Sequence, residues 1–311
     1  MGTYDRRTFI KRSAVLAAAA AAVRVLPTHA SASPAAIRRE TCHAFFDGAG
    51  RAPEVIAHRG GDGQWPGETM RALREAAKLG ADVLEFDVFL SSDGELMLMH
   101  DHKVDKTTEG RGVVNNLDSK YLQGLNAGHK WSPDGKCRPF ENKSALDPQY
   151  RDLRVPRLAE VFDEFPRMRM VIEMKKANLS PAAALSKMIR ERGAQERVLV
   201  ASFKGKFMDE FRRFSPEVAT SYSLSKGDVE RLLSGRRLSD NEPGQPSAIQ
   251  LPYQLVTEER VRRAHARNIK VHAWTVNDLD KMYLMWNRGV DGIITDYPGP
   301  LLALLGRARP V

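Results

Sequence analysis

From about residue 53 onward, short runs of apolar and β-branched residues alternate with longer segments in which apolar residues recur every three or four positions. The short runs have the composition of buried strands, and the longer segments have the period of amphipathic helices. We expect eight strands, at Val55–Arg59, Val83–Val88, Met170–Lys175, Val198–Phe203, Ala219–Tyr222, Ala248–Leu251, Val271–Val276 and Gly292–Thr295. Strands that alternate with helices in this way pair in parallel.

The predicted helices lie between these strands, at Thr69–Leu79, Pro181–Arg192, Lys206–Phe214, Thr257–Arg267 and Asp278–Asn287. Several begin at a residue type that caps helix starts, and several end at a glycine. Eight strands in this alternation predict an α/β fold of the (β/α)8 TIM-barrel type. A doubly wound open sheet is the alternative that the pattern leaves open.

One apolar run, Glu95–Met99, follows the second strand without an intervening helix. Asp93-Gly94 lies between the two runs and is typical of a two-residue hairpin turn. We therefore expect an antiparallel β-hairpin arm outside the barrel. With those two residues as the turn, the register places Asp87 directly opposite His100.

Residues 126–155 are a second departure from the alternation. They are rich in Pro, Gly, Asn, Lys and Asp and show little periodicity. This composition predicts a long loop or a small insertion on the barrel.

Residues 1–32 have the pattern of an export signal. Arg6-Arg7 precedes an apolar run of 11 residues, Ser13–Val23, which is too short to span a bilayer, and Ala30-Ser31-Ala32 has the spacing that a signal peptidase reads. The paired arginines resemble a twin-arginine signal, and a basic amphipathic helix is the alternative. We therefore expect residues 33–311 to form a single barrel domain that is exported to the periplasm or out of the cell.

Charge and composition narrow the classes of partner. The chain carries a net charge of +9, of which +4 lies in residues 1–32, so the remainder is mildly basic at +5. This charge favours small anionic substrates. The sequence contains no nucleic-acid-binding motif. No apolar stretch reaches the ~18–20 residues of a membrane-spanning helix. Two cysteines exclude a disulfide scaffold and a classical zinc module. A single bond between Cys42 and Cys137 stays open for an exported protein.

Charged side chains stand at the ends of three predicted strands, where barrel enzymes carry their chemistry. In chain order these residues are His58 and Arg59, Glu85 and Asp87, and Glu173 and Lys175. Residues two apart on a strand point the same way, so each of the last two pairs shares one face. The hairpin adds His100, and we expect all seven side chains to meet in one site.

Each residue type in this set suits one chemical role. Three carboxylates without a sulfur ligand suit a hard divalent cation, Mg²⁺ or Ca²⁺. The two histidines suit a general acid and a general base, and the arginine and lysine suit an anionic phosphoryl group. The set predicts metal-assisted hydrolysis of a phosphate ester. Trp274, at another strand end, is either a wall of the pocket or a core aromatic residue.

The same residues lie in ordered blocks, from about Val55 to Leu305, that resemble the glycerophosphodiester phosphodiesterase family. The blocks are Val55–Gly60, Pro66–Thr69, Leu84–Val88, Met99–Asp101, Thr107–Gly110, Asn126–Gly128, Val155–Val161, Val171–Lys175, His272–Asn277 and Gly289–Asp296. The resemblance implies a barrel that hydrolyses glycerophosphodiesters to sn-glycerol 3-phosphate and an alcohol. By the same resemblance, His58 and His100 are the acid/base pair. The metal ligands are Glu85, Asp87 and Glu173, and the phosphate contacts are Arg59 and Lys175.

One position departs from the family pattern. The second block usually ends in Asn-Thr, whereas Glu68 precedes Thr69 here. An ionised glutamate cannot donate a hydrogen bond as asparagine does, so a contact made by this side chain must differ. We leave Glu68 unassigned, and capping of the helix that starts near Thr69 is one alternative.

Other functions remain open at this point. The first is lysophospholipase D-like hydrolysis of lysolipids, for which residues 126–155 would shape an acyl-chain groove. Trp131 and Phe140 are the only large apolar side chains of this segment besides Leu146 and, at its edge, Leu125, so the sequence gives it no clear lipid-binding surface. The second is an exported phosphodiester-binding protein without catalysis, against which both histidines argue. A barrel aldolase or isomerase is more distant, because only Lys175 is placed to form a Schiff base. The pattern does not assign the acid and base roles between the two histidines, nor does it choose between water and a glycerol hydroxyl as nucleophile.

Overall fold

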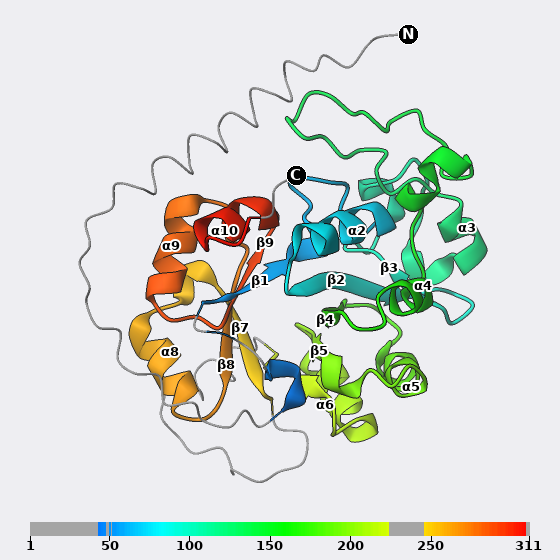
Figure 1. Ribbon diagram of the computed structural model, residues 1–311. Helices are drawn as coiled ribbons and strands as arrows, with labels where there is room; N and C mark the ends of the chain where they lie inside the picture. The colour runs from blue at the N-terminus through cyan, green and yellow to red at the C-terminus, as the bar shows by residue number, and fades with distance from the viewer. Residues whose placement is uncertain (1–42, 48–49, 51, 224–245, 309–311) are drawn as a thin grey trace.

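The computed structural model describes residues 43–47, 50, 52–223 and 246–308. In this part of the chain, eight parallel strands form a nearly closed barrel with helices on its outside (Figure 1). The strands are β1 (Glu54–Ala57), β2 (Val83–Leu90), β4 (Arg169–Met174), β5 (Val198–Ala201), β6 (Ala219–Thr220), β7 (Ala248–Pro252), β8 (Lys270–Trp274) and β9 (Gly292–Thr295). The predicted TIM-type barrel is confirmed.

The order of strands around the barrel is β6-β5-β4-β2-β1-β9-β8-β7, and every neighbouring pair is parallel. The two ends of this order meet at a single bridge between Ser221 and Ala248. The backbone N–H of Tyr222 donates to the carbonyl oxygen of Ala248 across this junction at 2.9 Å. This junction nearly closes the sheet into a barrel, which excludes the open-sheet alternative.

The helices of the described residues pack on the outside of the barrel and around the insertion. They are α2 (Met70–Leu79), α3 (Ser119–Gln123), α4 (Leu158–Glu164), α5 (Ala182–Glu191), α6 (Gly205–Phe214), α8 (Glu258–His265), α9 (Leu279–Asn287) and α10 (Pro298–Leu304). Thr69, Thr257 and Asp278 cap α2, α8 and α9 through their side-chain oxygens, as their positions in the sequence predict.

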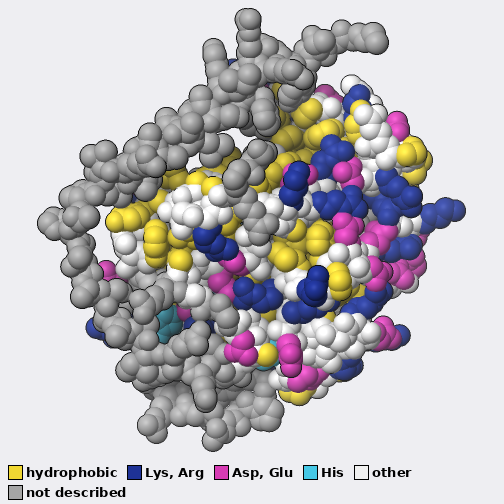
Figure 2. All heavy atoms as spheres, viewed as in Figure 1, with side chains coloured by type: hydrophobic (Ala, Val, Ile, Leu, Met, Phe, Trp, Pro, Cys, Tyr) yellow, Lys and Arg dark blue, Asp and Glu magenta, His cyan; other side chains and the backbone are white. Residues whose placement is uncertain are grey.

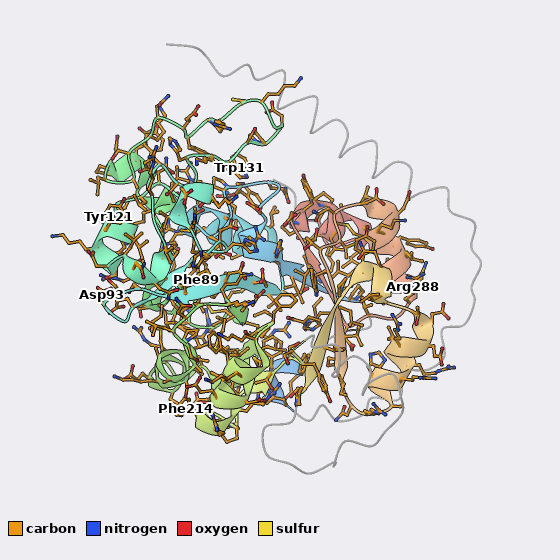
Figure 3. All side chains as sticks on the ribbon, turned by 180° about the vertical axis from the view of Figure 1, so that it is seen from behind. Phe89, Asp93, Tyr121, Trp131, Phe214 and Arg288 are labelled. Carbon is orange, nitrogen blue, oxygen red and sulfur yellow. The ribbon has the colours of Figure 1, made fainter. Side chains whose placement is uncertain are left out.

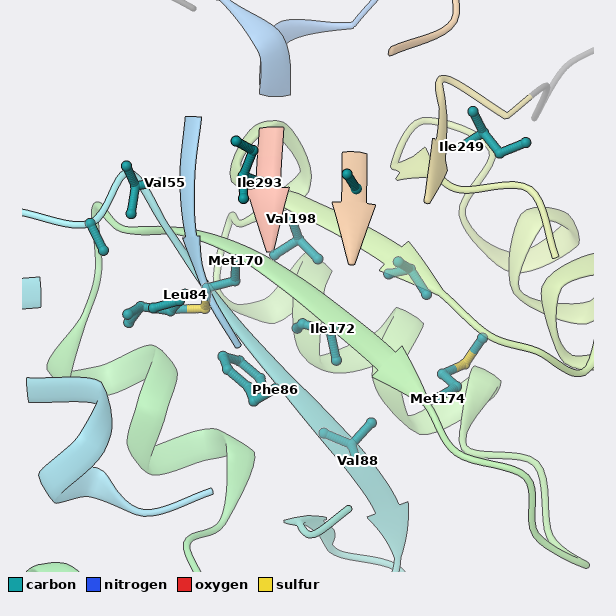
Figure 4. Packing of buried hydrophobic residues seen from close by; sticks show 14 of the residues in the cluster. Val55, Leu84, Phe86, Val88, Met170, Ile172, Met174, Val198, Ile249 and Ile293 are labelled. Atoms are coloured by element: carbon teal, nitrogen blue, oxygen red, sulfur yellow. The ribbon is translucent and has the colours of Figure 1, made fainter. Parts of the chain in front are cut away.

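Alternating residues of each strand face the helices and the barrel interior. Leu84, Phe86 and Val88 of β2 point outward with their counterparts on neighbouring strands, and together they form the main core (Figure 4). The intervening residues of the same strand change from Val83 to Glu85 and Asp87 as the strand approaches its carboxyl end. The period of two therefore buries the apolar face and turns the carboxylates inward.

An apolar layer closes the amino-terminal end of the barrel. Phe45 and Phe46 are buried against Ile56, Val171 and other inward-facing residues. The guanidinium of Arg169 lies 5.6 Å from the centre of the Phe45 ring. This plug excludes water from one end of the barrel, so polar groups inside it open only toward the carboxyl ends of the strands.

The antiparallel arm is present, but its register differs from the prediction. β3 (Leu96–Leu98) pairs with β2 so that Phe89 lies opposite Met97, and the N–H of Met99 donates to the carbonyl of Asp87 at 3.0 Å. The turn has three residues rather than two, because Ser91 pairs with Glu95. One extra turn residue shifts every pair by one. The predicted pairing of Asp87 with His100 is therefore wrong, and Met99 takes the opposite position.

The irregular segment is longer than predicted and has its own small core. Between β3 and α4, the chain wraps over the arm and buries apolar side chains from both parts: Phe89, Met97, Met99, Val104, Val114, Leu122, Leu125, Ala127 and Val155. Asp93 at the tip of the arm accepts hydrogen bonds from the N–H and hydroxyl of Ser119 in α3. Phe89, Asp93 and Tyr121 of α3 lie on one side of the molecule (Figure 3). The arm and the insertion therefore pack as one unit.

Basic and acidic side chains are interspersed on the surface over the insertion and α4 (Figure 2). Several of them form ion pairs, including Arg74 with Glu164, Arg154 with Glu160 and Arg192 with Asp163. In the part of the chain that the structure describes, no helix is long and apolar enough to cross a membrane. The predicted signal segment, residues 1–32, lies outside the described residues. Cys42 also lies outside the described residues, so its disulfide bond with the exposed Cys137 stays a prediction.

His272 of β8 is a polar residue in the apolar interior of the barrel. It is fully buried, and neither ring nitrogen has a hydrogen-bond partner among the described residues. Gly292 on the adjacent strand leaves room for the ring, because a Cβ there would lie 2.9 Å from His272 Cδ2. Burial lowers the pKa of His272 to about 4. The imidazole is therefore neutral in the folded protein at neutral pH.

Because the ordinary pKa of histidine is near 6.5, the unfolded chain binds this proton before the folded chain does as pH falls. We expect His272 to lower the free energy of unfolding by about 2 kcal/mol between pH 7 and pH 5. Urea denaturation of the wild type and His272→Leu in metal-free buffer measures this, and the variant should lose that part of the pH dependence. His102→Leu, at an exposed position, is the control. Equal pH dependence in the wild type and His272→Leu would contradict the prediction.

Candidate active site

The loop after β1 carries the first two site residues. β1 ends at Ala57, two residues earlier than predicted, and His58–Gly60 form a 3₁₀ turn. Arg59 has a φ of +52° and Gly60 a φ of +79°. A Cβ at Gly60 would lie 2.8 Å from the backbone of α2, so only glycine fits there. This turn directs His58 and Arg59 across the mouth of the barrel.

The three predicted metal ligands are brought together by strand pairing. Asp87 of β2 lies beside Glu173 of β4 in the parallel register. Glu85 precedes Asp87 on the same face, and one oxygen from each of the three carboxylates lies within 4.8 Å of the others. Glu85 and Asp87 are almost fully buried, at 5% and 1% exposure. The geometry therefore matches a set of oxygen ligands for one hard cation.

Three carboxylates this close together cannot all be ionised easily. Burial raises the pKa of Glu85 to about 7, with the charge of Asp87 adding to the effect and His58 opposing it. Burial and then the charge of Asp87 raise the pKa of Glu173 to about 8. Burial would also raise the pKa of Asp87, but Lys175 and Arg59 outweigh it and lower that pKa. A divalent cation among these oxygens would favour ionisation of all three.

The two predicted phosphate contacts flank Asp87. Lys175 Nζ lies 3.4 Å from Asp87 Oδ1 and 3.1 Å from Glu173 Oε1. Arg59 Nε lies 3.6 Å from Asp87 Oδ2, which is beyond hydrogen-bond range. Both of these atoms are buried and have no hydrogen-bond partner among the described residues. Arg59 and Asp87 thus retain unused hydrogen-bonding capacity for an anionic ligand and a cation, respectively.

His58 is held by a carboxylate from the last strand. Its Nδ1 lies 2.5 Å from Asp296 Oδ1. Asn277 Nδ2 donates to the other oxygen of Asp296 at 2.6 Å, and Asn277 Oδ1 accepts from the Asp296 N–H at 2.9 Å. Burial would lower the pKa of His58, but the charge of Glu85 and the hydrogen bond to Asp296 outweigh it and raise that pKa. The arrangement fixes the ring and leaves Nε2 for chemistry.

His100 faces the same cavity from the chain that leaves the arm. Burial lowers the pKa of His100. The charge of Asp87 acts in the opposite direction, and the charges of Arg59 and Lys175 lower the pKa further. Its Nδ1 lies 3.5 Å from Asp101 Oδ2, so the ring has no carboxylate partner as close as that of His58. The pKa values of the two histidines are therefore displaced in opposite directions, which suits a pair of one acid and one base.

One cavity of about 140 Å³ contacts all seven predicted polar residues and Trp274. The indole N–H of Trp274 donates to the carbonyl of Gln250 at 2.9 Å, and its ring meets Phe203 edge to face at a centroid distance of 5.7 Å. Trp274 therefore forms part of the apolar wall of this cavity. Ser202, Tyr222 and Gln250 also line it.

Asp296 and Asn277 are polar residues of the site that the sequence pattern did not predict, although both lie shortly after apolar strands. Asp296 follows β9, and Asn277 follows β8 by three residues. A polar residue at the end of an apolar strand was the signal used for the first three strands, and the same signal applies here. Phe203, Tyr222 and Gln250 carried no comparable signal.

Several known proteins are similar to this chain over most of its length. Residues 58–300 match the model of the glycerophosphoryl diester phosphodiesterase family. A glycerophosphodiester phosphodiesterase from Caldanaerobacter subterraneus is 31% identical over 256 residues, covering 81% of this chain and 97% of the relative. One from Bacillus subtilis is 29% identical and covers 78% of this chain and 83% of the relative.

Solved structures resemble the whole barrel. A phosphodiesterase from Oleispira antarctica in complex with the product sn-glycerol-3-phosphate is 25% identical, with a TM-score of 0.66, covering 82% of this chain and 97% of that one. A glycerophosphodiester phosphodiesterase from Agrobacterium tumefaciens shares the fold, with 23% identity, a TM-score of 0.64 and coverage of 81% and 99%. The chain is thus a phosphoric diester hydrolase that belongs to the glycerophosphoryl diester phosphodiesterase family.

Proposed function

We propose that the protein hydrolyses glycerophosphodiesters to sn-glycerol 3-phosphate and an alcohol, with a divalent cation bound by Glu85, Asp87 and Glu173. The observation that carries the proposal is that these carboxylates, two histidines and two cationic side chains line one cavity. A bound Mg²⁺ or Ca²⁺ supplies a Lewis acid that polarises a phosphoryl oxygen. The raised pKa values of Glu85 and Glu173 and the unpartnered Asp87 Oδ2 fit such an ion.

The other side chains of the cavity stabilise charge or transfer protons in the proposed reaction. Arg59 and Lys175 offset the negative charge that develops on the phosphoryl oxygens. One histidine removes a proton from the nucleophile, which is water or the glycerol hydroxyl beside the ester. Attack by the hydroxyl gives a cyclic phosphate, which water then opens to glycerol 3-phosphate. The other histidine donates a proton to the oxygen of the departing alcohol as its bond to phosphorus breaks. Asp296 orients His58 for either role through Nδ1.

We expect turnover of glycerophosphocholine and glycerophosphoethanolamine to require a divalent cation. A coupled assay for glycerol 3-phosphate, with EDTA, Mg²⁺ and Ca²⁺ arms, measures it. Glu173→Gln, which removes one charged ligand, should lower kcat/KM by about 100-fold or more. Glu164→Gln, whose carboxylate pairs with Arg74 outside the cavity, is the matched control. Full activity in EDTA would remove the cation from the mechanism.

Asp296→Asn should lower kcat by about 100-fold or more with little change in KM, because His58 loses its charged partner and its fixed orientation. His58→Ala should lose a similar amount. If Asp296 acts through His58, the double variant should be no slower than His58→Ala alone. Asp278→Asn, which changes a neighbouring helix cap, is the control. Additive losses in the double variant would contradict this coupling.

A second candidate substrate class is supported by the rim of the cavity. Phe203 lines the cavity, and Leu179, Leu255 and Leu279 follow β4, β7 and β8 at the same end of the barrel, with Leu279 at the start of α9. Each of these four residues, which we call the apolar rim, is at least 41% exposed. A lysophospholipase D from Mus musculus is 24% identical and covers 79% of this chain. This apolar rim suits the acyl chain of a lysolipid.

We place the acyl chain of a lysolipid against this apolar rim rather than against residues 126–155, none of which lines the cavity. Trp131 donates its indole N–H to the carbonyl of Asp62, and the Phe140 ring lies beneath the guanidinium of Arg71. Lysophosphatidylcholine in the same assay tests this second candidate. Phe203→Ser should lower its turnover more than that of glycerophosphocholine, and equal effects would exclude a role for the rim.

We also propose that residues 1–32 are a twin-arginine-type export signal and that residues 33–311 are the mature barrel domain, located in the periplasm or outside the cell. The paired arginines, the short apolar run and Ala30-Ser31-Ala32 support this proposal. Amino-terminal sequencing of the exported protein should begin at Ser33. Recovery of the intact chain in the cytoplasm alone would contradict it.

A further inference from the structure

Glu68 occupies an unusual position at the end of the loop that follows β1. It does not cap α2, because Thr69 Oγ1 accepts from the Ala72 N–H at 3.2 Å and performs that role. The Glu68 side chain is buried and turns toward β2 instead. Its Oε1 and Oε2 lie 3.1 Å and 3.4 Å from the backbone nitrogen of Asp87. The alternative of helix capping is therefore wrong.

The contact fills a gap along the edge of β2. β1 pairs with β2 only through Ile56 and Ala57, and β3 begins to pair with β2 only at Val88. Asp87 lies between these two pairings. Its carbonyl accepts from the Met99 N–H, and its own N–H donates to Glu68. A buried N–H without an acceptor is strongly unfavourable, so the Glu68 side chain replaces the strand that is missing here.

The backbone around Glu68 is adapted to this contact. Glu68 has a φ of +59°, which is unfavourable for a residue with this side chain. Its N–H donates to the carbonyl of Arg59 at 3.1 Å, so the two residues close the neck of the loop. Arg59, at a φ of +52°, donates its own N–H to Glu85 Oε2 at 2.9 Å. Arg59 thus contacts Glu85, and Glu68 contacts Asp87, the two acidic residues of β2.

We propose that Glu68 is a positioning residue for Asp87, which holds the β2 backbone so that the Asp87 carboxylate stays in register with Glu85 and Glu173. This inference rests on the proposed cation site. A carboxyl oxygen accepts from an N–H whether or not the group is protonated, so the role does not depend on the charge of Glu68. Glu68 acts through Asp87 and contacts neither the substrate nor the reacting atoms.

The test is the affinity of the metal-free protein for Mg²⁺ and for Ca²⁺, measured by isothermal titration calorimetry. Glu68→Gln keeps an acceptor oxygen of the same reach and should bind within about 3-fold of the wild type, whereas Glu68→Met removes the acceptor and should bind about 10- to 100-fold more weakly. In turnover at saturating cation, Glu68→Met should recover most of its kcat. Recovery of kcat by added cation separates lost positioning from general unfolding.

Glu68→Gly is the second variant, for the case in which Glu68→Met does not fold. Glycine accepts the positive φ without strain, which offsets part of the cost of leaving the Asp87 N–H without its acceptor. This variant should therefore stay folded and still bind the cation more weakly. Glu109→Met is the matched control, because both Glu109 oxygens accept from the backbone N–H of Asn126 in the insertion, away from the cavity. It should bind both ions as the wild type does.

Three outcomes distinguish the possible failures. Wild-type affinity in both Glu68→Met and Glu68→Gly would overturn the positioning role. Glu68→Gln as weak as Glu68→Met would also overturn it, because the loss would then follow charge rather than the hydrogen-bond acceptor. A wild-type protein that binds neither ion would remove the cation site itself, and the inference about Glu68 would fall with it.

Discussion

Mutual repulsion among three buried carboxylates is the constraint on which the rest of the site depends. Glu85, Asp87 and Glu173 lie within 4.8 Å of one another in the interior of the barrel, where charge is poorly solvated. Arg59 and Lys175 approach the Asp87 carboxylate from two sides, and the charge of His58 favours the ionised form of Glu85. The cationic groups therefore make the acidic cluster tolerable in the folded chain. The same groups are suited to an anionic phosphodiester beside a cation.

The acidic cluster needs a rigid surrounding structure, which the outer core of the barrel and the apolar layer at its amino-terminal end provide. The outward faces of the strands pack into one large core against the helices, while Phe45 and Phe46 seal the opposite end. The loop that carries His58 has two non-glycine residues at positive φ, Arg59 and Glu68. Contacts with the surrounding structure must hold both in this unfavourable conformation. The insertion contributes to this through the Trp131 hydrogen bond to Asp62 and the bidentate pair of Arg71 with Asp152. The irregular segment thus braces the loop that carries His58 and the start of α2.

The parts of the site that the sequence predicted correctly are those governed by strand periodicity. Glu85 and Asp87 share a face because a strand has a period of two, and they point inward because Leu84, Phe86 and Val88 must face the helices. The register of the arm failed because it depends on turn length. The Ser91 hydroxyl donates to Asp93 and accepts from the Glu95 N–H. These bonds stabilise a three-residue turn, which the Asp-Gly pair alone did not indicate. The capping interpretation of Glu68 failed because Thr69 is the better cap.

The sequence by itself determined the fold class, the positions of the strands and the acidic, basic and imidazole groups at their ends, since these follow from local periodicity and residue chemistry. Only the tertiary structure decided which groups meet across long separations. Asp296 reaches His58 because β9 lies beside β1 after the barrel closes, although 238 positions separate them in the chain. Glu68 reaches the Asp87 N–H because β1 ends early and leaves that edge of β2 open. Such contacts depend on strand order and on where each strand stops, and the packing of the whole barrel sets both.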